Sequence, residues 1–402
     1  MEDEFFFDKK NQKTFVPLPP NAIIGIVGGG QLGRMSALAA ARLGYRCHIL
    51  TPEEDSPAAQ VSAAATIGDY EDPAALRAFA SAVDVITFEF ENVSAAGLEL
   101  LTSCKPVRPG PHVLRISQDR IAEKTFLNAE AGAATAPFAP IETLDDLRAA
   151  AARLGLPAIL KTTRLGYDGK GQARLASEVD LAPAFARLSP KPLIFEGFVD
   201  FECEISVIVA RGGNGDSRAF DVVENRHRDH ILDLTLAPAP IAPQTAAAAR
   251  EIALRVADAL DLVGLLAVEM FVDRDGRVLV NEIAPRPHNS GHWTIDACPA
   301  SQFEMHIRAV AGLPLPLAAR HSDAVMKNLV GAEETALWPQ ILATQGLIPH
   351  LYGKKEARPG RKMGHVTRLF AKGALPGEAG IALALGPLGR QNFMTRASAA
   401  AK

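Results

Sequence analysis

The sequence lacks the features that mark disulfide-rich, membrane-embedded or nucleic-acid-binding proteins. Its four cysteines are far apart and none belongs to a CxxC or Cys/His cluster, so we expect reduced thiols without a disulfide framework. No apolar run reaches the roughly 18 residues of a membrane span, and the first 20 residues are charged where a signal peptide needs an apolar core. These absences predict a cytoplasmic protein with no membrane partner.

An excess of either charge is lacking as well. The 42 basic and 46 acidic residues give a formal net charge of −4, so we expect no nucleic-acid partner and infer that any bound anion is held by a local cluster. No internal repeat is present. What remains is a chain of 402 residues with 48% hydrophobic content, enough for two or three domains with cores of their own.

The first quarter of the chain alternates strand and helix signals. We expect, in order, a strand at 22–27 (AIIGIV), a glycine turn at 28–33 (GGGQLG), a helix at 34–43, a strand at 46–50, a helix at 73–80 and a strand at 83–88. This alternation predicts a parallel α/β layer that ends near 109–111 (PGP).

The rest of the chain carries a second α/β pattern followed by strands. We expect a helix at 117–129, a linker at 136–140 (APFAP), strands at 157–162 and 193–196, a strand at 204–209, a helix at 243–260 and a hairpin within 265–280. Beyond 324 the pattern predicts short strands and turns, and the last dozen residues are typical of a frayed tail.

Two glutamates carry the clearest chemistry. Glu269 (LLAVEMFVD) and Glu282 (VLVNEIAP) each interrupt an apolar run, and the turn residues 273–276 (DRDG) between them predict that they face each other across a hairpin. Two adjacent carboxylates repel unless a cation lies between them, and magnesium binds one or two carboxylates together with substrate phosphates. The alternative is a pair that points outward to solvent. The rigid segment 285–289 (PRPHN) that follows favours a site, because Arg and His on a loop suit an anion.

Two glycine-rich segments are candidates for phosphate binding. The turn 28–33 resembles a dinucleotide fingerprint, but the second strand ends in Thr51 and Pro52 rather than in a ribose-binding acid, which favours phosphate over NAD. The loop 166–171 (GYDGKG) lacks the closing GK[ST] of a Walker A sequence; it can cover a triphosphate, or it is a solvated turn. Lys161 favours the first reading, because a lysine that ends an apolar strand needs a counter-anion.

Three further segments have a plain solvated loop or strand end as their alternative. The segment 196–199 (EGFV) can offer backbone groups to an adenine, with Glu204 near a ribose. Glu89 and Glu91 follow the third strand, at the edge where open α/β sheets bind ligands. The basic run 354–362 (KKEARPGRK) can hold a phosphate around its Pro-Gly turn.

Taken together, seven segments resemble those of the N5-carboxyaminoimidazole ribonucleotide synthetase family, the ATPase subunit of phosphoribosylaminoimidazole carboxylase in the ATP-grasp superfamily. In order they read GGGQLGRM, FEFEN, KTTRLGYDGKGQ, EGFVDFECEISV, NRHRDHIL, NEIAPRPHNSGHWTIDA and YGKKEARPGRKMGH, and they span about 22–370. The resemblance implies an α/β and α+β architecture: an ATP-grasp fold with an N-terminal Rossmann-like (pre-ATP-grasp) domain and a small C-terminal β-rich domain. The expected divisions are an arm at 1–20, domains at 21–116, 117–323 (smaller lobe about 137–197) and 324–390, and a tail at 391–402.

The implied activity is that of a carboxylate-amine ligase of purine (IMP) biosynthesis. ATP, bicarbonate and 5-aminoimidazole ribonucleotide would give N5-carboxyaminoimidazole ribonucleotide, ADP and phosphate through carboxyphosphate. The resemblance further implies magnesium or manganese as the metal and a homodimer as the assembly.

The resemblance also assigns residues. Glu269 and Glu282 correspond to the metal ligands. The ATP contacts would be Arg120, Lys161, Gly166, Tyr167, Asp168, Gly169, Lys170, Gly171, Gln172, Glu196, Gly197, Phe198, Val199, Glu204, His227, Asn281 and Glu282. The ribonucleotide contacts would be Gly30, Gln31, Leu32, Glu89, Tyr167, Asp168, Lys170, Arg286, His288, Asn289, Lys354 and Arg361.

Four of these residues would act in the chemistry. Lys161 would neutralise phosphate charge, Arg286 would stabilise developing negative charge, and Asp168 or His288 would accept a proton. Three alternatives remain open at this point: a formate-dependent glycinamide ribonucleotide transformylase, an NAD-dependent dehydrogenase, and a nucleotide-binding regulatory protein without turnover.

Overall fold

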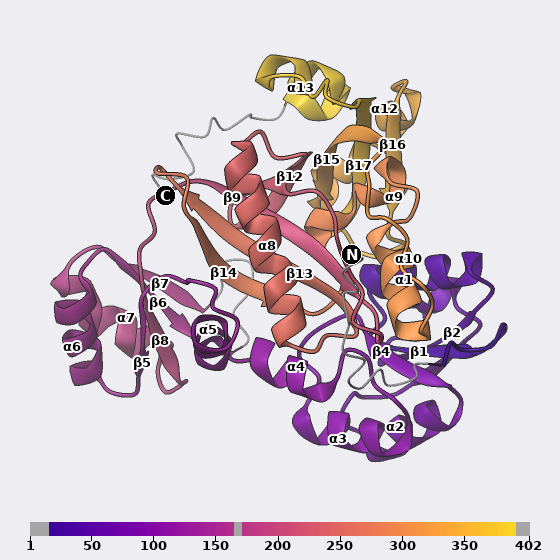
Figure 1. Cartoon of the computed structure of the whole chain (residues 1–402), viewed down its shortest axis with the longest axis horizontal. Helices are drawn as coiled ribbons and strands as arrows, with labels where there is room; N and C mark the ends of the chain where they lie inside the picture. Colours follow the sequence, from indigo (N-terminus) through magenta and orange to yellow (C-terminus); the bar gives the residue numbers. More distant parts are fainter. Residues whose placement is uncertain (1–15, 165–170, 391–402) are drawn as a thin grey trace, which may run out of the picture.

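Three β-sheets organise the chain in a computed structural model that describes residues 16–164 and 171–390. In Figure 1 a small lobe with α6 and α7 lies on one side of a long central sheet, and the N-terminal sheet with α2 and α3 lies below it. Helix α5 (Arg120–Ala129) lies between the small lobe and the rest of the molecule.

The N-terminal sheet is parallel, as the sequence predicts. Its strand order is β3-β2-β1-β4, formed by β1 (Ile23–Val27), β2 (Arg46–Thr51), β3 (Ala64–Ile67) and β4 (Val85–Phe88). Three helices accompany the strands: α1 (Gln31–Arg42), α2 (Pro73–Ser81) and α3 (Ala95–Cys104). The strand β3 was not expected, because its short sequence AATI lies at the edge of the sheet and is largely exposed.

Two predicted helix boundaries are wrong. Helix α1 begins at Gln31, inside the predicted glycine turn, because Gly33 allows close packing: a Cβ there would lie 3.0 Å from the carbonyl oxygen of Gly28. The expected helix 117–129 is α5, which begins three residues later than predicted, and α4 (Pro111–Ser117) before it was not expected. Asp119 starts α5 anew, since its carboxylate accepts the backbone N–H groups of Ile121 and Ala122.

The small lobe is an antiparallel sheet of order β5-β8-β6-β7. It consists of β5 (Phe138–Ile141), β6 (Ala158–Thr162), β7 (Gln172–Leu175) and β8 (Leu193–Gly197), covered by α6 (Leu144–Leu154) and α7 (Leu181–Leu188). The predicted linker at 136–140 is wrong, because most of it forms β5. Pro140 is tolerated there because β5 is an edge strand, where a missing N–H costs no ladder bond.

The central sheet has the path β14-β13-β9-β11-β12-β15-β17-β16, with β10 (Ser217–Ala219) paired to β9. Its first strands are β9 (Phe201–Arg211), β11 (Val223–Arg228), β12 (Ile231–Ala237), β13 (Gly264–Asp273) and β14 (Val278–Ala284). Helix α8 (Pro243–Ala259) crosses this sheet and buries its alanines against β9 and β13 in the largest apolar cluster. The helices α9 (Thr294–Ala297) and α10 (Gln302–Ala311) follow β14.

Beyond 324 the predicted strands are present, but two of them are long and the three helices among them were not expected. The strands β15 (Ser322–Val330), β16 (Leu347–Leu351) and β17 (Lys362–Ala371) extend the central sheet, and α11 (Gly331–Ala336), α12 (Trp338–Ala343) and α13 (Glu378–Ala384) lie beside them. Lys327 interrupts the apolar pattern of β15 although its side chain is buried. The full length of this strand is therefore not evident from the sequence. The ammonium group of Lys327 lies 2.7 Å from Asp233 and 2.8 Å from Glu334.

Within the described ranges 16–164 and 171–390, no helix is both long enough and apolar enough to cross a bilayer.

Candidate active site

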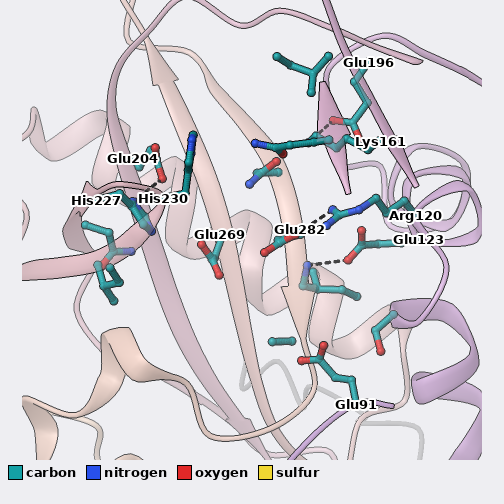
Figure 2. A pocket seen from close by; sticks show the side chains of 18 of the residues that line it. Glu91, Arg120, Glu123, Lys161, Glu196, Glu204, His227, His230, Glu269 and Glu282 are labelled. Atoms are coloured by element: carbon teal, nitrogen blue, oxygen red, sulfur yellow. Dashed lines mark hydrogen bonds and ion pairs between the residues drawn. The ribbon is translucent and has the colours of Figure 1, made fainter. Parts of the chain in front are cut away.

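A cavity of about 900 Å³ is lined by residues of the small-lobe sheet and the central sheet, together with the start of α1 and the loop after β4 of the N-terminal sheet. Figure 2 shows Glu269 and Glu282 on neighbouring strands at its centre, Arg120 and Glu123 beside them, and Glu196 with Lys161 at one end. The cavity is therefore enclosed by segments that are far apart in the sequence.

The two glutamates are direct partners in the antiparallel pair of β13 and β14, which confirms the predicted hairpin. Both line the cavity, so the outward-pointing alternative is wrong. Glu269 lies 3.0 Å from His288 Nε2, and Glu282 lies 3.0 Å from the Arg120 guanidinium. Burial alone would raise the pKa of Glu269, but His288 and its other cationic neighbours lower that pKa to about 2.

This donor set fits a magnesium ion. Two carboxylates in register, one of them ionised far below neutral pH, offer the hard oxygen ligands that magnesium takes, and the amide of Asn281 lines the same cavity. The repulsion between the glutamates is balanced here by Arg120 and His288.

One turn of α5 holds the strand that carries Glu282. Arg120 contacts Glu282 itself, Glu123 accepts the N–H of Ile283 at 2.7 Å, and Lys124 donates to the carbonyl of Asn281 at 3.1 Å. Burial and the nearby Glu282 raise the pKa of Glu123 to about 8. Three consecutive β14 residues are thus fixed from one helix.

Lys161 has a counter-anion within the protein. Its Nζ lies 2.9 Å from Glu196, whose carboxylate also lies 3.5 Å from Lys124. Residues 196–199 line the cavity beside them, as does Glu204, which is 3.0 Å from His227. Burial would lower the pKa of His227, but the Glu204 carboxylate outweighs this effect and raises it.

The glycine turn binds a carboxylate rather than presenting free donors to a phosphate. The backbone N–H groups of Gly30 and Gly33, at the start of α1, donate to Glu89, the latter at 2.7 Å. Burial raises the pKa of Glu89, whereas these N–H groups lower it. Glu89 occupies these N–H groups in this structure, and phosphate binding at them stays a prediction. Arg286 lies 2.7 Å from Glu91.

His288 is held by a chain of buried hydroxyl and amide groups. Its Nδ1 is 2.8 Å from the Ser290 hydroxyl, which is 2.7 Å from the hydroxyl of Ser206. Asn225 donates to Ser206 at 2.9 Å. With Nδ1 engaged in this way, Nε2 is the ring nitrogen that faces Glu269. Asn289 is also constrained, because its amide exchanges two hydrogen bonds with Asn328.

Lys354 and Arg361 of the basic run are not part of the cavity wall. Lys354 donates to the carbonyl of Lys362 at 2.7 Å and lies over the Tyr352 ring, while Arg361 donates to the carbonyl of Glu356 at 3.0 Å. Burial, and next the positive charge of Arg361, lower the pKa of Lys354 to about 8. Two cations therefore lie near each other, and of this run Lys362 lines the cavity.

Most of the predicted site residues that the structure describes line this one cavity. They are Gln31, Leu32, Glu89, Arg120, Lys161, Gln172, Glu196, Gly197, Phe198, Val199, Glu204, His227, Glu269, Asn281, Glu282, Arg286, His288 and Asn289. The lining does not include Gly30, Gly171, Lys354 or Arg361. Gly166, Tyr167, Asp168, Gly169 and Lys170 lie outside the described residues.

Glu123 and Lys124 were missed by the sequence reasoning. Both are almost fully buried, at 2% and 1% exposure, although a charged pair in a short helix ordinarily indicates a solvated face. A signal was present: they follow Arg120 by three and four residues and therefore share its face of α5.

Family models match three consecutive parts of the chain. The ribonucleotide synthetase preATP-grasp domain matches residues 22–118, the ATP-grasp domain matches 126–303, and the phosphoribosylaminoimidazole carboxylase C-terminal domain matches 324–374.

Similar proteins and structures cover nearly the whole chain. An N5-carboxyaminoimidazole ribonucleotide synthase of Brucella melitensis is 54% identical over 88% of this chain and 97% of its own length, and one of Bacillus subtilis is 44% identical over 87% and 91%. A crystal structure of an N5-carboxyaminoimidazole ribonucleotide synthetase with ADP has a TM-score of 0.85 at 43% identity, covering 88% of this chain and 94% of that one. The Aspergillus clavatus synthase with ADP and 5-aminoimidazole ribonucleotide has a TM-score of 0.84 at 32% identity, covering 92% and 97%.

Proposed function

The chain belongs to the N5-carboxyaminoimidazole ribonucleotide synthase family, and on that premise we propose that it is an ATP-grasp ligase of purine biosynthesis. The reaction is the ATP-dependent carboxylation of 5-aminoimidazole ribonucleotide by bicarbonate, which releases ADP and phosphate. The observation that carries the proposal at the level of the site is the register of Glu269 and Glu282 in a cavity that Lys161 and Arg120 also line.

ATP occupies the end of the cavity near β8 in this proposal. The backbone of 196–199 contacts the adenine, Glu204 and His227 contact the ribose, and Lys161 and Arg120 contact the phosphates. Gln172, Asn281 and the loop residues Gly166, Tyr167, Asp168, Gly169, Lys170 and Gly171 complete the nucleotide site. The cavity supports this assignment because its cationic side chains lie opposite the two glutamates, where a phosphate chain needs both cations and a metal.

Glu269 and Glu282 would hold magnesium, or manganese in its place. When bound, the metal supplies positive charge that offsets the phosphate oxygens. Arg120 and His288, which pair with these carboxylates here, would have to yield some of that contact to the metal.

The ribonucleotide lies toward the N-terminal sheet in this proposal. Glu89, Arg286 and His288 contact it, with Gln31 and Leu32 of α1 beside them. Lys354 and Arg361 hold its 5′-phosphate, and their proximity to each other and to Glu89 supports this placement. Gly30 contributes less directly, because its N–H is taken by Glu89, and Asn289 acts through the loop that it shares with His288.

The chemistry follows from charge. Bicarbonate must attack a γ-phosphate although both are anions, so Lys161 and Arg120 lower the repulsion and carboxyphosphate forms with release of ADP. Arg286 leaves its ion pair with Glu91 and stabilises negative charge as the carboxyl group passes to the exocyclic amine. The amine proton is accepted by Asp168 or by His288, whose orientation is fixed through Ser290.

The test is ADP release measured with ATP, bicarbonate and 5-aminoimidazole ribonucleotide, and then with each omitted in turn. We expect turnover to require the ribonucleotide and to rise with bicarbonate. Robust turnover with formate and glycinamide ribonucleotide instead would overturn the proposal and favour a transformylase.

The family resemblance also implies a homodimer in the cytoplasm, which we include in the proposal. Sedimentation equilibrium tests the assembly, because a dimer has twice the chain mass of 42.8 kDa. A monomer mass throughout the micromolar range would reject it.

A further inference from the structure

Glu196 is a single carboxylate shared by two lysines in different surroundings. Lys161 lies 2.9 Å from it, is 15% exposed and lines the cavity. Lys124 lies 3.5 Å from the same oxygen, is 1% exposed and is absent from the cavity wall. The carboxylate itself is 5% exposed. One lysine can therefore reach a ligand, and the other cannot.

A buried carboxylate resists the loss of its only cation, because an unpaired charge away from water is strongly unfavourable. If Lys161 were the sole partner of Glu196, its transfer to a phosphate would leave that charge uncompensated. Burial alone would raise the pKa of Glu196, but Lys161 and next Lys124 hold it below its usual value. Lys124 thus supplies a second positive charge that remains when Lys161 moves.

We propose that Lys124 is a positioning residue that acts through Lys161: by neutralising Glu196 from the protein interior, it makes Lys161 available to the ATP phosphates. The inference rests on the proposed function, since it takes ATP as the ligand of Lys161. Lys124 touches neither substrate nor the reacting atoms.

A second contact of Lys124 connects the release of Lys161 to β14, the strand that carries Glu282. Its Nζ donates to the carbonyl of Asn281 at 3.1 Å, and Asn281 precedes Glu282 in β14. Glu196 belongs to β8 of the small lobe, so one ammonium group joins the small-lobe sheet to the central sheet. Removing it should therefore weaken nucleotide binding without a direct effect on the ribonucleotide side, which lies by the N-terminal sheet.

The experiment is calorimetric titration of magnesium-ATP into the full chain and its variants. Lys124→Met should weaken ATP binding roughly tenfold to hundredfold, because Lys161 stays on Glu196 and one charge-assisted phosphate contact is lost. Binding of 5-aminoimidazole ribonucleotide should stay within about threefold of wild type. Lys191→Met, the same change at an exposed position just before β8, is the matched control and should bind ATP like the wild type.

Variants that keep or remove the charge at Lys124 are decisive. Lys124→Arg keeps a positive charge beside Glu196 and should bind ATP within about threefold of wild type. Lys124→Gln keeps a donor toward the Asn281 carbonyl but has no charge, so it should lose ATP affinity as Lys124→Met does, and it decides the matter if Lys124→Met does not fold.

Each outcome has a distinct meaning. Wild-type ATP affinity in Lys124→Met or Lys124→Gln, or no recovery of affinity in Lys124→Arg, would overturn the role of Lys124. Failure of the wild-type chain to bind ATP at all would instead overturn the proposed function.

Discussion

Glu269 and Glu282 have different partners in the site. Glu269 is paired with an imidazole whose other nitrogen is fixed by Ser290, whereas Glu282 is paired with a guanidinium from α5. A metal ion that enters between them competes with one partner on each side. Each carboxylate therefore has an ion-pair or imidazole partner before the cation arrives.

The first prediction concerns these carboxylates. Glu282→Gln should lower the rate of ADP release by on the order of a hundredfold or more at ordinary magnesium, because a neutral amide leaves the metal under-neutralised. Glu269→Gln should do the same. Glu251→Gln, on the exposed face of α8, is the control. Near-normal rates and an unchanged magnesium dependence in both site variants would contradict the assignment.

The second prediction concerns the basic run. Arg361→Ala should raise the KM for 5-aminoimidazole ribonucleotide by about tenfold to hundredfold, which is the worth of one charge-assisted phosphate contact. The KM for ATP should stay nearly unchanged. Arg358 in the same turn is 70% exposed and pairs with Glu356, so Arg358→Ala is the matched control. Equal changes in both KM values, or no change in either, would mean that Arg361 is a solvent-facing residue that does not bind the phosphate.

At the scale of residues, charged side chains that interrupt an apolar strand could be predicted from the sequence. Charged side chains that are buried only through the packing of a helix could not. Glu269 and Glu282 stand out because a carboxylate inside an apolar run is costly. Glu123 and Lys124 do not, because the same residues are common on solvated helices. Glu89 was expected near a ligand, but that it would occupy the N–H groups of α1 depends on the approach of two distant loops.

At the scale of elements, α5 does more than connect two domains. Its first turn contacts three consecutive residues of β14, and its position is set by the carboxylate of Asp119 on the N–H groups of Ile121 and Ala122. The residue at which α5 begins therefore determines the position of Glu282.

The third prediction separates the effect of Asp119 on the stability of the fold from its effect on the position of Arg120. Asp119→Ala removes an N-cap and should lower the free energy of unfolding by about 1 kcal/mol. It should also lower kcat/KM for ATP, because Arg120 is the next residue. Asp72 caps α2 in the same way and lies in the N-terminal helical layer, so Asp72→Ala should cost similar stability without the kinetic effect. Equal kinetic losses in both variants would mean that stability alone explains them.

The elements themselves were predictable where pattern and packing agree. The parallel layer and the β13–β14 hairpin follow from apolar runs and turn residues. The full length of β15 was not predictable, because Lys327 is neutralised by Asp233 and Glu334 from other elements. The strand β5 contains a proline that is acceptable only because the strand is at an edge.

At the scale of the whole molecule, the cavity exists only while the three sheets stay docked. Helix α1 packs against α10, and their contact joins the N-terminal sheet to the central part through Ile307 and Val310. Inside this contact the Thr87 hydroxyl lies 2.9 Å from His306 Nε2, and both side chains are buried. A buried polar pair thus lies beside the apolar side chains of this interface.

That pair makes the docking sensitive to acid. Burial lowers the pKa of His306 to about 4, whereas an unfolded histidine titrates near 6.5. Between these values the unfolded chain binds a proton that the folded chain does not, so stability falls as pH falls from 6.5 toward 4. For this residue the loss between pH 7 and pH 5 is about 2 kcal/mol.

The fourth prediction follows from this sign. His306→Gln keeps a hydrogen-bonding group toward Thr87 but cannot titrate, so between pH 7 and pH 5 it should lose about 2 kcal/mol less unfolding free energy than the wild type. Denaturant titration at the two pH values measures the difference. Other buried histidines, such as His292 and His365, keep an acid dependence in both proteins, and burial lowers the pKa of each. His321→Gln at an exposed site is the control. Identical pH dependence in His306→Gln and wild type would show that the interface opens before His306 is protonated, and would place the acid sensitivity elsewhere in the fold.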